Sequence, residues 1–116
     1  MTALALLCPG QGGQHGAMFE RVAGDKAAEA VLQATTALLG FDPRARDTGI
    51  YPDAYYENRI AQPLVCSAIL ATWAALGPSL PRPRVIAGYS VGELAAYGCA
   101  GALDVTQTLE IGRAHV

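Results

Sequence analysis

Charged side chains are scarce in this sequence. Asp, Glu, Lys and Arg together make up 16% of the residues, and Lys26 is the single lysine. The eight basic and ten acidic residues form no run of like charge and leave a net charge of -2. Because nucleic-acid binding requires clustered Lys and Arg, the sequence argues against nucleic acid as a partner.

Cysteine and histidine are also scarce, with three and two residues respectively. The three cysteines, Cys8, Cys66 and Cys99, are an odd number without a C-x-x-C pair or a His at ligand spacing. This pattern indicates neither a disulfide framework nor a zinc site, so we expect no metal and interpret the cysteines as small buried thiols.

Uninterrupted apolar segments of membrane-spanning length are also missing. The apolar stretches at 61–76 and 94–103 are broken by Gln62, Pro63, Gly98 and Gly101, so neither reaches the about 20 apolar residues that a span requires. Residues 1–8 lack the positive charge that opens a signal peptide. We therefore expect no membrane association and a cytoplasmic location.

Apolar residues, by contrast, make up 52% of the 116 residues, enough for the core of one small domain. Continuous apolar segments at 3–8 and 85–87 predict strands buried on both faces, which are typical of parallel sheets. Helical spacing predicts helices at 25–39, 60–76 and 93–100, with another that begins after Asp104. Residues 41–58 predict a loop with one short helix at most. The pattern indicates an α/β fold with parallel strands flanked by helices.

Two of these helices carry specific sequence signals. In the first, Asp25 is the expected N-cap and Gly40 the expected end. In the second, Gly77 and the proline after it are expected to end the helix. Its apolar stripe is predicted to comprise Val65, Ile69, Trp73 and Leu76.

A serine lies at the junction between the second predicted strand and the helix that follows it. Residues 88–92 read G-Y-S-V-G and match the G-x-S-x-G nucleophile elbow. In such an elbow a strained turn exposes the Ser90 hydroxyl, and the Val91 N–H at the helix start can stabilise an oxyanion. An ordinary serine in a tight turn remains the alternative.

The first predicted strand is followed by a glycine-rich loop, C-P-G-Q-G-G-Q-H-G at residues 8–16. Its backbone could bind a nucleotide phosphate, or the Gln11 N–H could supply the second donor of an oxyanion hole. The dinucleotide fingerprint would require a third glycine where His15 stands, and no P-loop occurs. A third interpretation is that the loop is a glycine-rich turn with a purely structural role.

Taken together, both loops resemble those of the malonyl-CoA:acyl-carrier-protein transacylase family. Residues 9–14, P-G-Q-G-G-Q, resemble its PGQGSQ motif, and residues 88–93, G-Y-S-V-G-E, resemble its GHSLGE elbow. Between them, I-A-Q-P at 60–63 resembles its T-Q-P segment. The resemblance identifies residues 1–110 as the N-terminal part of an acyltransferase domain, an incomplete α/β hydrolase-like core.

The resemblance implies a mechanism and a set of site residues. Ser90 would be the nucleophile that becomes malonylated, Gln11 and Val91 the backbone donors to the oxyanion, and Gln62 a residue lining the pocket. Malonyl would pass from malonyl-CoA to Ser90 and then to a phosphopantetheine-type thiol of an acyl carrier protein, with no bound cofactor. Tyr89 for His, Cys8 for Phe and Gly13 for Ser resemble the branch that serves biotin-independent malonate decarboxylase as its epsilon subunit.

Other family residues have no counterpart here. The family's general base is a His farther beyond the serine than this chain extends, so we expect the chain to be inactive alone. The family's carboxylate-binding Arg falls on His115, and Arg113 would face another side of its helix. His15 is interpreted as a loop residue.

Residues 111–116, I-G-R-A-H-V, are interpreted as a non-native tail. They are the translation of ATC GGA AGA GCA CAC GTC, a common sequencing-library adapter, and the resemblance ends after Leu109. Two alternatives to a transferase also remain: a serine esterase of α/β hydrolase type and a nucleotide-binding module.

Overall fold

The computed structural model describes residues 3–15, 17–45 and 57–114. Its elements follow one another as β1 (Ala5–Cys8), η1 (Glu20–Val22), α1 (Lys26–Leu39), α2 (Asn58–Leu76), η3 (Gly77–Ser79), β2 (Val85–Gly88), α3 (Val91–Cys99) and α4 (Val105–Ala114). The predicted α/β class is confirmed. Most of the predicted 41–58 loop, Gly16 of the first loop and His115 lie outside the described residues.

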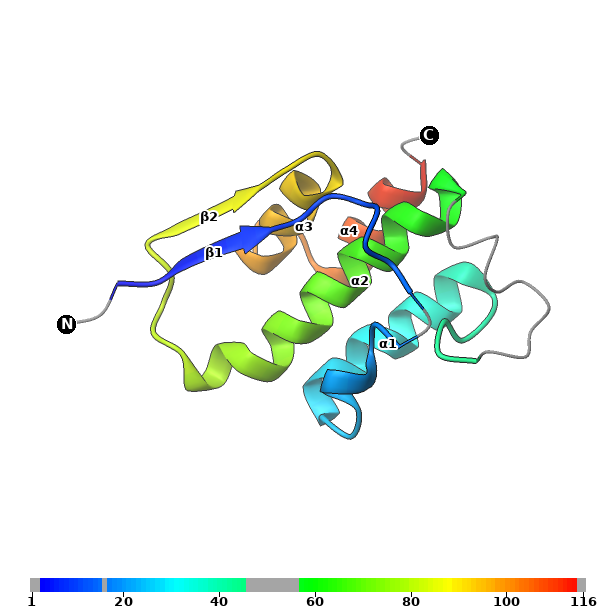
Figure 1. Cartoon of the computed structure of the whole chain (residues 1–116), viewed down its shortest axis with the longest axis horizontal. Coiled ribbons are helices and arrows are strands. Elements are labelled where there is room, and N and C mark those ends of the chain that lie inside the picture. The colour runs from blue at the N-terminus through cyan, green and yellow to red at the C-terminus, as the bar shows by residue number, and fades with distance from the viewer. Residues whose placement is uncertain (1–2, 16, 46–56, 115–116) are drawn as a thin grey trace.

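The sheet consists of β1 and β2 within the described part of the chain, paired in parallel with Ala5 opposite Val85 and Cys8 opposite Gly88. The Tyr89 N–H donates to the Cys8 carbonyl at 3.0 Å, so the pairing continues to the residue before Ser90. Both strands therefore end at the same edge, where the first loop and the serine turn begin (Figure 1).

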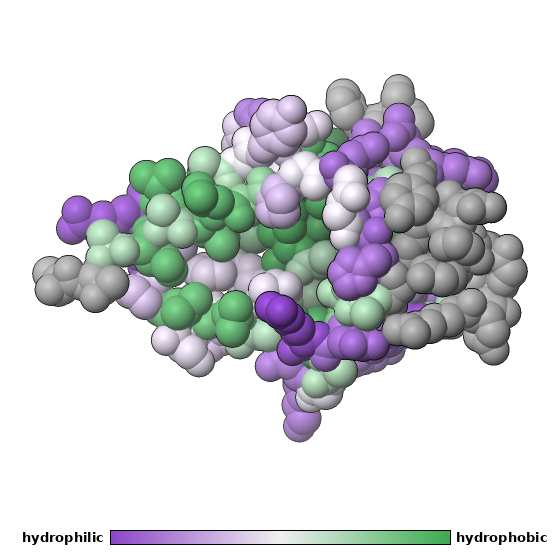
Figure 2. All heavy atoms as spheres, in the orientation of Figure 1, coloured by the Kyte–Doolittle hydropathy of each residue, from purple (hydrophilic) through white to green (hydrophobic). Residues whose placement is uncertain are grey.

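The prediction that both strand faces are buried is wrong. Exposed and half-buried positions alternate along the strands, and Leu7 and Val85 are 73% and 55% exposed. Figure 2 shows apolar residues gathered on the surface over the strands and the nearby end of α2. The reason is that the described helices do not cover the face of the sheet to which these two side chains belong.

Helix α1 begins and ends where the sequence predicts. The Asp25 carboxylate accepts the Ala28 N–H at 2.9 Å, and Gly40 ends the helix at φ 81°. That left-handed conformation suits glycine, which has no Cβ to clash. The helix buries Val31 and Leu32 against α2.

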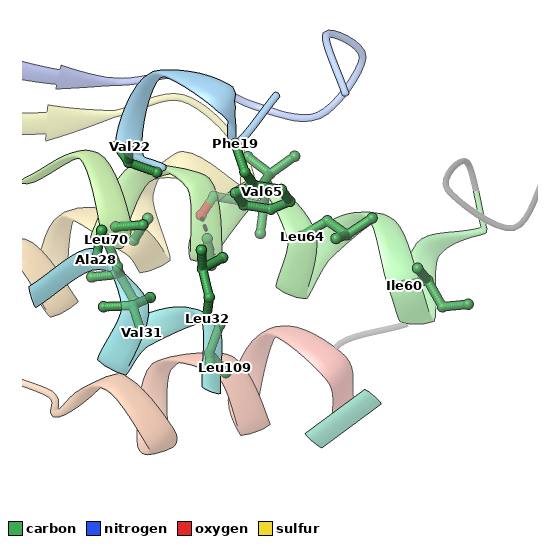
Figure 3. Packing of buried hydrophobic residues seen from close by; sticks show 14 residues of the cluster. Phe19, Val22, Ala28, Val31, Leu32, Ile60, Leu64, Val65, Leu70 and Leu109 are labelled. Carbon is green, nitrogen blue, oxygen red and sulfur yellow. Dashed lines mark hydrogen bonds between the residues drawn. The ribbon is translucent and has the colours of Figure 1, made fainter. Parts of the chain in front are cut away.

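Helix α2 is the centre of the molecule and contacts α1, α3 and α4. Figure 3 shows Leu64 and Leu70 of α2 among the core side chains contributed by α1 and α4, such as Leu32 and Leu109. The predicted apolar stripe of α2 is largely wrong: Val65 is buried, but Ile69 and Trp73 are half-buried and Leu76 is 52% exposed. A helix surrounded on several sides has no single apolar stripe, so its periodicity misled the prediction.

Helix α2 runs through Gln62 and Pro63, the two residues that break its apolar composition, as the predicted helix at 60–76 requires. By length and composition alone, Asn58–Ser79 could cross a membrane, with a mean hydropathy of 1.6. In this structure 44% of the most apolar 18-residue window in that segment is buried inside the protein. A central core helix has the same composition, so this property is weak evidence for a membrane span.

Two buried hydroxyls link α1 to α2. Thr35 Oγ1 donates to the Val31 carbonyl at 2.9 Å and lies 2.6 Å from Ser67 Oγ. Because the single Thr35 proton goes to Val31, the Ser67 hydroxyl donates to Thr35. Both polar groups are thereby satisfied in a fully buried position.

Helix α4 begins at the predicted cap. The Asp104 carboxylate accepts the Gln107 N–H at 2.7 Å, and the Gln107 side chain accepts the Asp104 N–H at 3.0 Å. Residues 111–114 continue this helix, and Arg113 Nη1 donates to the Leu38 carbonyl at 3.0 Å. The boundary at residue 110 stays a prediction.

Candidate functional site

Ser90 occupies the turn between β2 and α3 in a strained backbone conformation. Its φ of 57° and ψ of −127° make it the one non-glycine residue with positive φ among the described residues. Such conformations cost about 1–3 kcal/mol and persist only where the surroundings enforce them. Ser90 is exposed, so the turn presents its side chain away from the core.

Glycines on either side of Ser90 allow the turn to form. A Cβ at Gly88 would lie 2.1 Å from the Gly92 carbonyl oxygen, and a Cβ at Gly92 would lie 2.2 Å from the Cys8 carbonyl oxygen. Both contacts are with backbone atoms, which cannot rotate away. The local packing therefore accounts for the G-x-S-x-G spacing.

The N-terminus of α3 points a backbone donor toward the turn. Val91 is the first residue of this helix, so its N–H has no acceptor within the helix. The next two N–H groups are engaged: Gly92 donates to the Tyr89 carbonyl and Glu93 to the Ser90 carbonyl, each at 3.0 Å. The Val91 side chain is buried at 8% exposure, which fixes the start of the helix in the core.

The glycine-rich first loop packs directly against the serine turn. A Cβ at Gly10 would lie 3.1 Å from the Tyr89 carbonyl oxygen and 3.3 Å from the Ser90 Cβ. Only glycine permits this close approach without displacing a neighbour. Gln11 follows Gly10 directly in this loop, and its assignment as an oxyanion donor stays a prediction.

Side chains hold the first loop at two points. Gln14 is 4% exposed, and its Oε1 accepts the Gly12 N–H at 2.7 Å. Gln11 Nε2 donates to Asn58 Oδ1 in the first turn of α2 at 3.0 Å. Sequence reasoning missed both. Gln14 belongs to the P-G-Q-G-G-Q motif, whereas Asn58 is 47 positions from Gln11 and carries no sequence signal.

Gln62 lies on α2, one helical turn after Asn58 and one before Cys66. Its side-chain oxygen is buried and has no hydrogen-bond partner within the described residues. Cys66 in turn donates weakly to the Val91 carbonyl, with a sulfur–oxygen distance of 3.9 Å. Through Cys66 this part of α2 contacts the start of α3, and Gln62 carries a buried acceptor that has no partner within the described residues.

The cysteine thiols near the turn are poor nucleophiles. Burial is the main cause that raises the pKa of Cys66 to about 12 and that of Cys99 to about 12. Burial also raises the pKa of Cys8, opposed by a weaker effect of a hydrogen bond with Cys99. Because only a thiolate attacks readily, these thiols are inert at neutral pH.

The hydrogen bonds of His15 and Arg113 are made away from the serine turn. His15 Nδ1 accepts the Ala17 N–H at 3.2 Å and so stabilises its own loop, while Arg113 contacts the end of α1. In residues 3–15, 17–45 and 57–114, no three His, Cys, Asp or Glu side chains gather at metal-binding spacing.

Comparisons of the sequence with known proteins find similar proteins that bear the name of the family that the motifs resemble. No family model matches the sequence. The malonyl CoA-acyl carrier protein transacylase of Salmonella typhimurium is 28% identical over 113 residues, and that of Escherichia coli K12 is 29% identical over 115 residues. Each match covers 96% of this chain and 37% of the relative.

Solved structures agree with these relatives. An acyl-carrier-protein S-malonyltransferase from Burkholderia pseudomallei matches with a TM-score of 0.86 and 26% identity, over 97% of this chain and 37% of that chain. The malonyl CoA-acyl carrier protein transacylase of Coxiella burnetii gives 0.78 and 31%, over 96% and 36%. This chain is therefore similar in sequence and in fold to malonyl CoA-acyl carrier protein transacylases, of whose length it spans about 37%.

Proposed function

We propose that Ser90 accepts a malonyl group from malonyl-CoA and passes it to the thiol of an acyl carrier protein. The observation that carries the proposal is the exposed Ser90 side chain on a strained turn, against which the first loop packs through Gly10. Relatives described as malonyl CoA-acyl carrier protein transacylases support the choice of acyl group. They support a transferase over an esterase or a nucleotide-binding module.

In the first half-reaction the Ser90 hydroxyl oxygen attacks the thioester carbonyl carbon and gives its proton to a general base. A tetrahedral oxyanion forms, the carbon–sulfur bond breaks, and coenzyme A leaves as a thiol after taking up the proton. The product is a malonyl ester on Ser90.

The oxyanion would be stabilised by two backbone donors. Val91 supplies the first N–H of α3, at the positive end of the helix dipole. Gln11 supplies an N–H from the first loop, beside the turn. Removing one such donor typically costs a factor of about 10²–10³ in rate. We further propose that the unused acceptor of Gln62 faces the substrate.

In the second half-reaction the carrier thiol gives its proton to the base and its sulfur attacks the carbonyl carbon of the Ser90 ester. The ester carbon–oxygen bond breaks, the malonyl group stays on the sulfur, and the Ser90 oxygen takes up the proton from the base. A solved structure described as a type II PKS acyl-carrier protein in complex with its malonyl-transacylase is 26% identical to this chain, with a TM-score of 0.84. Tyr89, Cys8 and Gly13 favour a carrier of malonate decarboxylase type. We expect the reaction to take place in the cytoplasm.

We assign Ser90 as the nucleophile and the Gln11 and Val91 backbones as oxyanion donors, and we assign no described residue as the base. His15 is committed to its own loop. We therefore propose that this chain alone acylates slowly at best, and that a base from additional polypeptide completes the cycle.

The proposal is tested by intact-mass analysis after incubation with malonyl-CoA. The sample is the polypeptide in which this chain occurs naturally, beside a Ser90→Ala variant and a Ser79→Ala control that removes another exposed serine. We expect one added malonyl group on the wild type and the control, lost when holo acyl carrier protein is added. An adduct on Ser90→Ala would refute the assignment, and release of free malonate without a carrier would indicate an esterase.

A further inference from the structure

Helix α2 contacts both loops of the site through side chains spaced four residues apart. Asn58, Gln62 and Cys66 lie on one side of the helix, because residues at this spacing share a face. At one end Asn58 accepts a hydrogen bond from Gln11, and at the other Cys66 contacts the Val91 carbonyl. The two residues assigned as oxyanion donors are thus both connected to one rigid element.

We propose that Asn58 is a positioning residue, which orients the first loop so that the Gln11 N–H faces Ser90. This inference rests on the proposed function. Asn58 does not touch the substrate. It acts through the Gln11 side chain, which it holds at 3.0 Å across a sequence separation of 47 residues.

The first loop requires such a tether because packing does not fix its tip. A Cβ added at Gly12 or Gly13 would meet nothing within 4 Å, and Gly12 has a φ of 129° that few residues other than glycine adopt. Successive glycines leave the backbone many conformations. Gln14 fixes Gly12 from within the loop, whereas Asn58 ties Gln11 to an element outside it.

Asn58 is well placed to serve as the fixed end of the tether. It lies in the first turn of α2, whose next residues Ile60 and Ala61 are 8% and 0% exposed. Movement of Asn58 would therefore disturb the core. Movement of Gln11 disturbs only an exposed hydrogen bond, so the loop adjusts to the helix.

The chemistry of the contact provides matched variants. Asn58→Ala removes the acceptor, whereas Asn58→Asp keeps an oxygen that accepts from Gln11 Nε2. Arg59→Ala is the control, since the neighbouring Arg59 side chain is exposed and pairs with Glu57 at 3.2 Å. Gln11→Ala removes the donor but retains the backbone N–H.

The first experiment measures the ¹⁵N order parameter of the Gln11 amide in the 116-residue chain. We expect a value near the about 0.85 of rigid backbone in the wild type, Arg59→Ala and Asn58→Asp, falling toward about 0.6 in Asn58→Ala. An unchanged value in Asn58→Ala overturns the inference, whether or not Ser90 accepts malonyl.

The second experiment measures the rate of Ser90 malonylation in the natural polypeptide as a function of malonyl-CoA concentration. We expect Asn58→Ala to lower the maximal rate about three- to tenfold, the range that one neutral hydrogen bond sets, without changing the half-saturating concentration. Asn58→Asp should restore the rate, and Asn58→Ala should have no further effect in a Gln11→Ala background. If the wild type is acylated and Asn58→Ala reacts at the same rate, the positioning role of Asn58 is overturned but the proposed function is not. If the wild type is not acylated, the proposed function itself is overturned.

Discussion

Gly92 joins the serine turn to the first loop, and its replacement by alanine tests the proposed geometry. A Cβ at this position would lie 2.2 Å from the Cys8 carbonyl oxygen and 2.5 Å from that of Pro9. Real Cβ atoms essentially never approach closer than 3.0 Å. The start of α3 and the end of β1 must therefore separate by at least about 0.8 Å.

This separation has an energetic cost that can be assigned from the structure. Overpacking of side chains costs about 1–3 kcal/mol, and the atoms involved here are backbone atoms that can yield less. Separation also strains the Tyr89 N–H bond to the Cys8 carbonyl, which contributes about 1 kcal/mol. The better helix propensity of alanine offsets up to about 1 kcal/mol. We expect a net loss of about 1–4 kcal/mol from the free energy of unfolding.

Urea denaturation of the chain, followed by circular dichroism, measures this loss. Gly13→Ala is the matched control, because a Cβ there meets nothing within 4 Å, and its free energy should stay within about 0.5 kcal/mol of the wild type. In the natural polypeptide the shifted loop should also slow acylation of Ser90, since about 1 Å of misplacement can cost about 10²-fold. A Gly92→Ala protein as stable and as reactive as the control would refute the reasoning.

Three further predictions concern the core. Gly112→Ala should stabilise the chain by about 0.5–1 kcal/mol, measured by urea denaturation, because alanine favours helix and its Cβ would meet its neighbours at ordinary distances of 3.6 Å or more. Thr35→Val should lower the free energy of unfolding, measured in the same way, by about 1–3 kcal/mol, because it leaves the Ser67 hydroxyl buried without its acceptor. Adding Ser67→Ala should recover part of that loss. A double variant less stable than Thr35→Val would contradict this account. Burial raises the pKa of Cys66 and Cys99 from 9.0 to about 12, so the folded state retains protons that the unfolded state loses. Stability should be complete below pH 9 and fall as pH rises toward 12, while Ellman's reagent at pH 8 should label these two thiols only after unfolding.

Local signals in the sequence predicted much of this fold. Asp25 and Gly40 mark the ends of α1, and Asp104 marks the start of α4, because caps act within a single helical turn. The G-x-S-x-G spacing at 88–92 predicted the strand, turn and helix around Ser90 for a similar reason. Each of these features depends on atoms close together in the chain.

Features that depend on the tertiary arrangement were not predictable. The sequence predicted that Leu7 lies in a strand buried on both faces, but Leu7 is exposed. Segments distant in the sequence decide which face of the sheet is covered by helices. The buried face of α2 depends on the positions of three other helices, so its own periodicity pointed to Leu76, which is exposed. The role proposed for Asn58 depends on a hydrogen bond to Gln11, 47 positions away, which only the fold reveals.

The parallel pairing of Ala5 with Val85 also has a consequence during synthesis. Strand β1 leaves the ribosome 80 positions ahead of β2, the strand with which it pairs, which at about 5–20 residues per second is a delay of roughly 4–16 s. Throughout that interval the apolar N-terminal strand has no partner, and closing so long a segment costs about 4 kcal/mol of chain entropy. The nascent chain is therefore most exposed to misassembly before Ser90 and the strand that precedes it have been translated.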